Sequence, residues 1–154
     1  MKLKLICIGS PRPPLADAIA EYERRIGHYF SYEAVELPAG RGTPAAVRLS
    51  EAGAIRDRVP DGFRVFALTR TGKPMDSRAL ADRLDELRSF GPSGAPWLIG
   101  GAFGLDDALI EEADFRLSLS PLTLPHELAR LVLVEQLYRA GTILRGEPYH
   151  KGGP

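Results

Sequence analysis

The chain has 154 residues, of which 44% are hydrophobic and 26% are charged, and its formal net charge is zero. This size and composition are typical of a single globular domain, residues 1–154, and exclude an intrinsically disordered chain, because the apolar content can offset chain entropy. With no net positive charge, any basic surface that contacts nucleic acid must be local.

The single cysteine and the hydropathy pattern indicate the cellular compartment of the protein. Cys7 is the only cysteine, which excludes an internal disulfide framework, fits a reducing cytoplasm and predicts a small core residue. The opening MKLKLICIG alternates too strongly for a signal peptide, and the chain lacks a run of roughly eighteen apolar residues that could span a membrane. We therefore expect a cytoplasmic protein with no membrane partner.

Apolar periodicity predicts strands and helices that alternate along the chain. A strand over 2–8 is followed by a helix over 15–30, a strand over 32–37 and a helix over 45–59. Next come a strand over 63–68, a helix over 77–90 with Ser77 as its N-cap, and a strand over 97–99. The last elements are a short helix over 106–113, a strand over 115–119 and a helix over 127–144.

This order predicts an α/β fold, a mostly parallel sheet with helices on both faces joined by right-handed crossovers. Ligands in such sheets bind beyond the carboxyl ends of the strands. The segments expected to matter are therefore those that follow each strand: 9–14, 38–44, 69–74, 100–105 and 120–126.

The glycine-rich turn IGGAFG, residues 99–104, follows a predicted buried strand. Glycines there allow backbone to approach a ligand closely, and the helix N-terminus that follows favours anions. A tight turn that needs left-handed dihedrals explains the same glycines equally well. Neither this turn nor GSPRPP at 9–14 matches GxGxxG, so a nicotinamide dinucleotide is not predicted.

The segment PLTLPHELARLVLVEQLYRA, residues 121–140, joins a stiff, uncharged loop to a helix with two apolar arcs. At ~100° per residue, Leu128, Leu131 and Val132 form one arc. The nearly opposite arc holds Leu133, Leu137, Ala140 and Leu144. Two arcs indicate burial on both sides of the helix, one against the sheet and one against a partner, which predicts a C2 homodimer. A central helix in a thick core is the alternative.

Three histidines, His28, His126 and His150, have no metal-ligand spacing and no acidic cluster beside them, so no metal site is predicted. Ser120 with His126 suggests a hydrolase, although no G-x-S-x-G elbow surrounds Ser120. His126 is either a spacer at a helix start or a base. The ending YHK, residues 149–151, can close over a site or bind a phosphate backbone, or it can be a solvated tail.

Several segments together resemble one family in the same order. They are MKLKLICIG, LTRTGKPMDS, LIGGAFGL, LSLSPLTLPHELAR, VLVEQLYRA and RGEPYHK. The family is the small bacterial ribosomal RNA large-subunit pseudouridine N3-methyltransferase of the SPOUT class, and the resemblance covers essentially the whole chain. It implies a sheet with a C-terminal trefoil knot, whose loops bind S-adenosyl-L-methionine in a bent shape, and an active homodimer with the site near the interface.

The resemblance also implies the site residues. Carried over one by one, the cofactor contacts are Leu68, Gly100, Gly101, Leu119, Ser120, Pro121, Leu122, Thr123 and Leu124. They fall on three of the segments that topology selects above. The loop 119–124 is accordingly expected to be an apolar, preformed slot for the adenine and ribose, which lowers the ordering cost of binding. Ala102 and Phe103, in the middle of the glycine turn, depart from the family pattern.

The implied activity is methyl transfer to N3 of a pseudouridine in 23S ribosomal RNA, within the large subunit or the 70S ribosome. His126, Arg130, Tyr149 and His150 are the candidates for substrate contact and proton handling, with no single base assigned. A neutral protein is expected to recognise such RNA by shape. A non-catalytic α/β nucleotide-binding module and a small hydrolase that uses Ser120 and His126 are the competing hypotheses.

Overall fold

The computed structural model describes residues 1–91 and 94–150, apart from the side chain of His150. Its strands are β1 (Lys2–Ile8), β2 (Ser31–Leu37), β3 (Phe66–Pro74), β4 (Gly94–Ile99) and β5 (Phe115–Ser118). Its helices are α1 (Leu15–Ile26), α2 (Pro44–Arg56), α3 (Ser77–Phe90), α4 (Asp107–Glu112), α5 (His126–Leu144) and the 3-10 helix η1 (Pro148–His150). None of the helices in this described part of the chain is long and apolar enough to cross a membrane.

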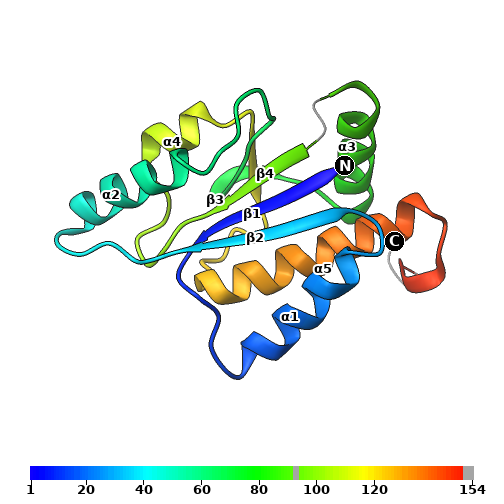
Figure 1. Ribbon diagram of the computed structural model, residues 1–154, viewed down its shortest axis with the longest axis horizontal. Coiled ribbons are helices and arrows are strands. Elements are labelled where there is room, and N and C mark those ends of the chain that lie inside the picture. Colours follow the sequence, from blue (N-terminus) through cyan, green and yellow to red (C-terminus); the bar gives the residue numbers. More distant parts are fainter. Residues whose placement is uncertain (92–93, 151–154) are drawn as a thin grey trace.

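The five strands form one parallel sheet in the order β2-β1-β4-β3-β5. Helices α1, α3 and α5 pack on one face, and α2 and α4 pack side by side on the other (Figure 1). The predicted α/β fold with a parallel sheet and helices on both faces is therefore confirmed.

The sheet divides the core into two apolar clusters because successive side chains of a strand point to opposite faces. In β1, Leu3 and Leu5 belong to the cluster under α1, α3 and α5, whereas Ile6 and Ile8 belong to the cluster under α2 and α4. All six residues of β4 are buried, as expected for a parallel strand covered on both faces.

The segment predicted as a loop at 69–74 is instead part of β3, so that prediction is wrong. Lys73 and Pro74 pair with Leu117 and Ser118 after a register shift that begins beyond Leu68. Gly72 permits this close pairing, since a Cβ there would lie 2.7 Å from the carbonyl carbon and oxygen of Arg116.

The start of α3 also differs from expectation. Asp76, not Ser77, is the N-cap, and its carboxylate accepts a hydrogen bond from the Ala79 amide at 2.7 Å. Ser77 is the first helical residue, and its hydroxyl donates to Gln136 of α5. An aspartate and a serine are both favoured caps; here Asp76 caps the helix and Ser77 contacts α5.

Candidate functional site

A cavity of about 520 Å³ lies where β3, β4 and β5 run into the segments that follow them. Of the residues expected to bind a cofactor, all except Pro121 line it: Leu68, Gly100, Gly101, Leu119, Ser120, Leu122, Thr123 and Leu124. Three segments that are far apart in the sequence thus converge on one cavity, whose volume is typical of a small-molecule site.

The glycine turn forms one wall of this cavity. Gly101 and Gly104 form an isolated antiparallel bridge, with the Gly104 amide donating to the Gly101 carbonyl at 3.1 Å. A Cβ on Gly100 would lie 2.5 Å from the carbonyl carbon of Gly104, and Gly104 itself has a φ of +76°. The tight-turn interpretation of IGGAFG is confirmed. The same backbone, which needs glycine at these positions, also faces the cavity.

The loop after β5 is held by its serines. The Ser118 hydroxyl donates to the Ser120 carbonyl at 3.0 Å, and the Ser120 hydroxyl accepts from the Leu122 amide at 3.0 Å. Leu119 and Leu124 are half-buried, whereas the Leu122 side chain is 73% exposed. Leu119, Leu122 and Leu124 all line the cavity, and the local turn leaves Leu122 more exposed than the other two leucines in the single chain. The expected slot for the adenine and ribose stays a prediction.

His126 begins α5 at the mouth of the same cavity. Its N-cap neighbour, Pro125, makes no side-chain capping bond. The imidazole packs on the turn after β1, because its Nε2 lies 3.3 Å from where a Cβ of Gly9 would stand. His126 thus acts as a spacer between two loops and also borders the cavity. Among the described residues no hydrogen bond joins it to Ser120, so the geometry does not support a hydrolase pair.

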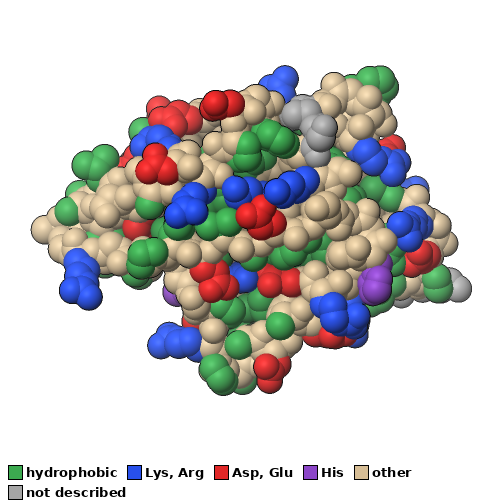
Figure 2. All heavy atoms as spheres, viewed as in Figure 1, with side chains coloured by type: hydrophobic (Ala, Val, Ile, Leu, Met, Phe, Trp, Pro, Cys, Tyr) green, Lys and Arg blue, Asp and Glu red, His purple; other side chains and the backbone are tan. Residues whose placement is uncertain are grey.

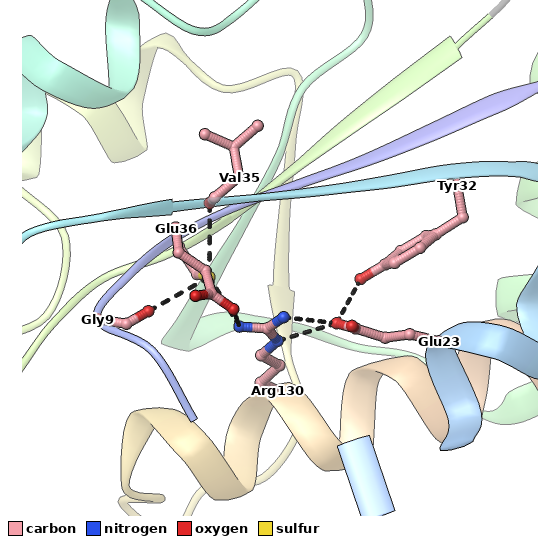
Figure 3. Close-up of polar contacts among 7 residues, drawn as sticks. Gly9, Glu23, Tyr32, Val35, Glu36 and Arg130 are labelled. Atoms are coloured by element: carbon pink, nitrogen blue, oxygen red, sulfur yellow. Dashed lines mark hydrogen bonds and ion pairs between the residues drawn. The ribbon is translucent and has the colours of Figure 1, made fainter. Parts of the chain in front are cut away.

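Arg130, one turn further along α5, does not line the cavity, and its side chain points toward Glu23 and Glu36 (Figure 3). Its side chain is only 5% exposed. Its Nε and Nη2 donate to one oxygen of Glu23 at 3.0 and 2.7 Å, and its Nη1 donates to Glu36 at 2.8 Å. The Tyr32 hydroxyl donates to the same Glu23 oxygen at 2.9 Å. These ion pairs link α5 to α1 and β2. They hold Arg130 away from the cavity, where substrate contact was expected.

Cys7 lies beside this ion-pair network. The Arg130 Nη1 is 3.4 Å from its sulfur. Burial raises the pKa of the Cys7 thiol to about 11, against the opposing effect of the Arg130 charge. The thiol therefore stays protonated near neutral pH, and the prediction of a small core residue is confirmed.

Tyr149 packs against the middle of α5. Its hydroxyl is 3.2 Å from that of Tyr22 and donates to Glu135 at 3.0 Å, and its ring packs edge-on against Tyr138. Burial raises the pKa of Tyr149, and its hydrogen bonds with Tyr22 and Glu135 raise it further, so the phenol stays protonated. Glu135 is about 14 Å along the helix from His126 at 1.5 Å per residue. Within one chain Tyr149 therefore does not meet the cavity, and the side chain of His150 lies outside the described residues.

The outer face of α5 borders a second cavity, of about 630 Å³. Val132, Gln136, Arg139 and Ile143 line it together with the start of α3 and the end of β5. The inner arc of α5 packs on the core, where Leu133, Leu137 and Ala140 are fully buried and Leu144 is half-buried. The outer arc, Leu128, Leu131 and Val132, is only half-buried. The alternative of a central helix in a thick core is therefore wrong.

Helix α2 contributes residues that the sequence interpretation missed. Arg48 lines the cavity, and Glu51, one turn later, is 4% exposed and lies against the glycine turn. The spacing of apolar residues could have indicated that Glu51 is buried, since it falls four residues after Val47 and four before Ile55, both of which are buried. A glutamate on the apolar stripe of a helix is rare unless it has a partner or a function.

The fold agrees with the comparisons with known proteins. The family described as "Predicted SPOUT methyltransferase" matches residues 1–150, and the chain belongs to that family. Proteins named "Ribosomal RNA large subunit methyltransferase H" are its sequence relatives. The one from Gemmatimonas aurantiaca is 48% identical over 98% of this chain and 100% of its own length. The one from an Anaeromyxobacter species is 46% identical with the same coverage.

Solved structures agree on the fold alone. A probable methyltransferase from Bordetella pertussis superposes with a TM-score of 0.56 at 20% identity, covering 90% of this chain and 95% of that one. A probable methylase family protein from Haemophilus influenzae gives a TM-score of 0.55 at 13% identity, covering 99% of this chain and 71% of that one. The trefoil knot expected for the class stays a prediction.

Proposed function

We propose that this chain is a cytoplasmic, single-domain methyltransferase that uses S-adenosyl-L-methionine to methylate N3 of a pseudouridine in 23S ribosomal RNA. The convergence of the segments after β3, β4 and β5 on one cavity is the observation that carries the proposal. The printed names of its relatives, which specify the RNA of the large ribosomal subunit, support the choice of substrate. The large subunit or the 70S ribosome is the expected substrate particle.

The lining of the cavity fits an adenosyl cofactor. Leu119 and Leu124 offer apolar surface for an adenine ring, and the backbone of the serine-held loop offers hydrogen-bonding groups for its edge. The bare backbone of Gly100 and Gly101 allows a ligand to approach closely. S-adenosyl-L-methionine, when bound, would supply a methyl group on a positively charged sulfur; N3 would form a bond to the methyl carbon as the carbon–sulfur bond breaks and S-adenosylhomocysteine leaves as a neutral thioether.

The chain's own residues then align the reactants and handle one proton. The preformed loop and glycine turn fix the position of the donor, which lowers the entropic part of the barrier. The proton on N3 must leave, and His126 is the titratable side chain of the candidate set at the mouth of the cavity. We infer that it accepts that proton or favours the anion, as a general base or a nearby cation would.

A homodimer completes this arrangement. The half-buried outer arc of α5 and the adjacent cavity form the surface that we assign to the contact between two copies. Tyr149 contacts Tyr22 and Glu135 and does not line the cavity of its own chain. In the proposed dimer Tyr149 and the tail that follows it reach the cavity of the partner. The charges on the face in Figure 2 are intermingled, with no region of one sign, which suits recognition of RNA shape rather than attraction by bulk charge.

Transfer of a tritiated methyl group tests the proposal. Ribosomes and large subunits from a strain that lacks the modification would be incubated with the protein and labelled S-adenosyl-L-methionine. We expect label in the large-subunit RNA at a single pseudouridine, and none in free small-subunit RNA. Binding of the cofactor without any transfer would instead favour the non-catalytic nucleotide-binding module.

A further inference from the structure

The Glu51 carboxyl group is buried with only one of its two oxygens satisfied. Its Oε1 accepts a hydrogen bond from the Gly40 amide at 3.0 Å. Its Oε2 is buried and has no hydrogen-bond partner among the described residues. A buried polar atom without a partner is costly and usually has a reason in function.

Only the thickness of the glycine turn separates this carboxyl group from the cavity. A Cβ on Gly101 would lie 3.1 and 3.2 Å from the two Glu51 oxygens, and Gly101 itself lines the cavity. The missing side chain at Gly101 therefore lets the carboxyl group stand directly behind the cavity wall. Arg48, one turn earlier on α2, lines the same cavity, so the helix has a guanidinium in the cavity lining and a carboxyl group behind the cavity wall.

A negative charge in this position acts strongly on a bound cation. Ile8, whose Cγ2 lies 3.0 Å from the same Cβ position of Gly101, and the surrounding apolar cluster keep water away. The effective dielectric constant is low where water is excluded, so Coulomb attraction across one peptide layer remains large. Uncharged parts of a ligand gain nothing from it.

We propose that Glu51 is an anionic determinant behind Gly101 that selects the positive charge on the amino-acid arm of the cofactor. This inference rests on the proposed function, because it assumes that an adenosyl cofactor occupies the cavity. Two groups on that arm can supply the charge: the sulfonium and the α-ammonium. Arg48 offers a matching contact for the α-carboxylate.

Calorimetric titration of the intact protein and its Glu51→Gln variant with three ligands tests the proposal. S-adenosyl-L-methionine carries both cations, S-adenosylhomocysteine carries only the α-ammonium, and 5′-methylthioadenosine carries neither. We expect Glu51→Gln to weaken S-adenosyl-L-methionine binding by about tenfold, the effect of one nearby charge in a protected site, and to leave 5′-methylthioadenosine binding unchanged. An unchanged S-adenosylhomocysteine affinity would assign the effect to the sulfonium, and a reduced one to the α-ammonium.

Equal losses for all three ligands would make Glu51 a structural support of the turn and overturn the proposal, as would an unchanged affinity for S-adenosyl-L-methionine. Glu112→Gln is the matched control, since it removes the same charge from an exposed ion pair with Arg56 and should alter no affinity. The thermal midpoint and the retained 5′-methylthioadenosine binding show that the variant is folded. If the unaltered protein bound none of the three ligands, the proposed function itself would fail, and this inference with it.

Discussion

Arg130 fastens α5 to two other elements through one buried guanidinium. Its partners Glu23 and Glu36 come from α1 and β2, so the contact links residues more than ninety positions apart. Burying the guanidinium and the two carboxylates removes them from water, which costs free energy. Their mutual attraction offsets this desolvation cost only while all three groups are present. The start of α5, which borders the cavity, is thereby fixed against the sheet.

Replacing Arg130 by methionine should be strongly destabilising. The substitution fills similar volume but leaves two carboxylates without their partner, and such a loss typically costs about 3–5 kcal/mol. Urea unfolding at fixed protein concentration measures the change. Arg24→Met is the control, because Arg24 pairs with Glu21 on the exposed surface of α1 and should lose far less. Equal effects of the two substitutions would contradict the structural role of Arg130.

At the scale of elements, the outer face of α5 should hold two copies together. Val132→Asp places a charge on the half-buried outer arc and should convert a dimer into a monomer, because an unpaired carboxylate at an apolar interface is costly. Sedimentation equilibrium measures the mass. Leu49→Asp is the control, since Leu49 is 66% exposed on α2 and lies outside the proposed interface. A monomeric unaltered protein, or a Val132→Asp variant that remains dimeric, would rule out this interface.

The bounds of the strands and helices show which elements could be predicted from the sequence. The strands at 2–8 and 32–37 and the last helix were predicted within one residue, because their apolar periodicity is strong. The extension of β3 was missed because Gly72 and Pro74 are typical turn residues, and only the pairing of this segment with β5 makes it a strand.

The candidate site was predictable where topology governs it. The carboxyl ends of parallel strands meet at one edge, so the segments that contain Gly100 and Leu119 had to converge. Arg48 and Glu51 reach the site through the packing of α2 on the sheet, which no local pattern specifies. The orientation of Arg130 toward Glu23 and Glu36, away from the cavity, depends on the same kind of long-range contact.

For the whole molecule, the separation of Tyr149 from its own cavity predicts complementation between subunits. Gly100→Ala should abolish cofactor binding in the cavity of the chain that carries it. Tyr149→Ala should abolish the contribution of that chain's C-terminal tail to the partner's site. Dimers that contain one copy of each variant keep one intact cavity facing one intact tail. Random mixing of the two variants should therefore restore about a quarter of the normal methyl-transfer rate. Recovery of no activity would mean that each chain uses its own tail.

The cavity at the ends of β3, β4 and β5 should bind the adenosyl cofactor, and calorimetric titration with S-adenosylhomocysteine measures this binding directly. We expect one site per chain in the unaltered protein. We also expect loss of binding in Gly100→Ala, where a Cβ would meet backbone atoms at 2.5 Å, and retention in Gly53→Ala, where a Cβ would meet nothing within 4 Å. Absence of binding to the unaltered protein, or full affinity in a folded Gly100→Ala variant, would show that the cofactor does not bind in this cavity.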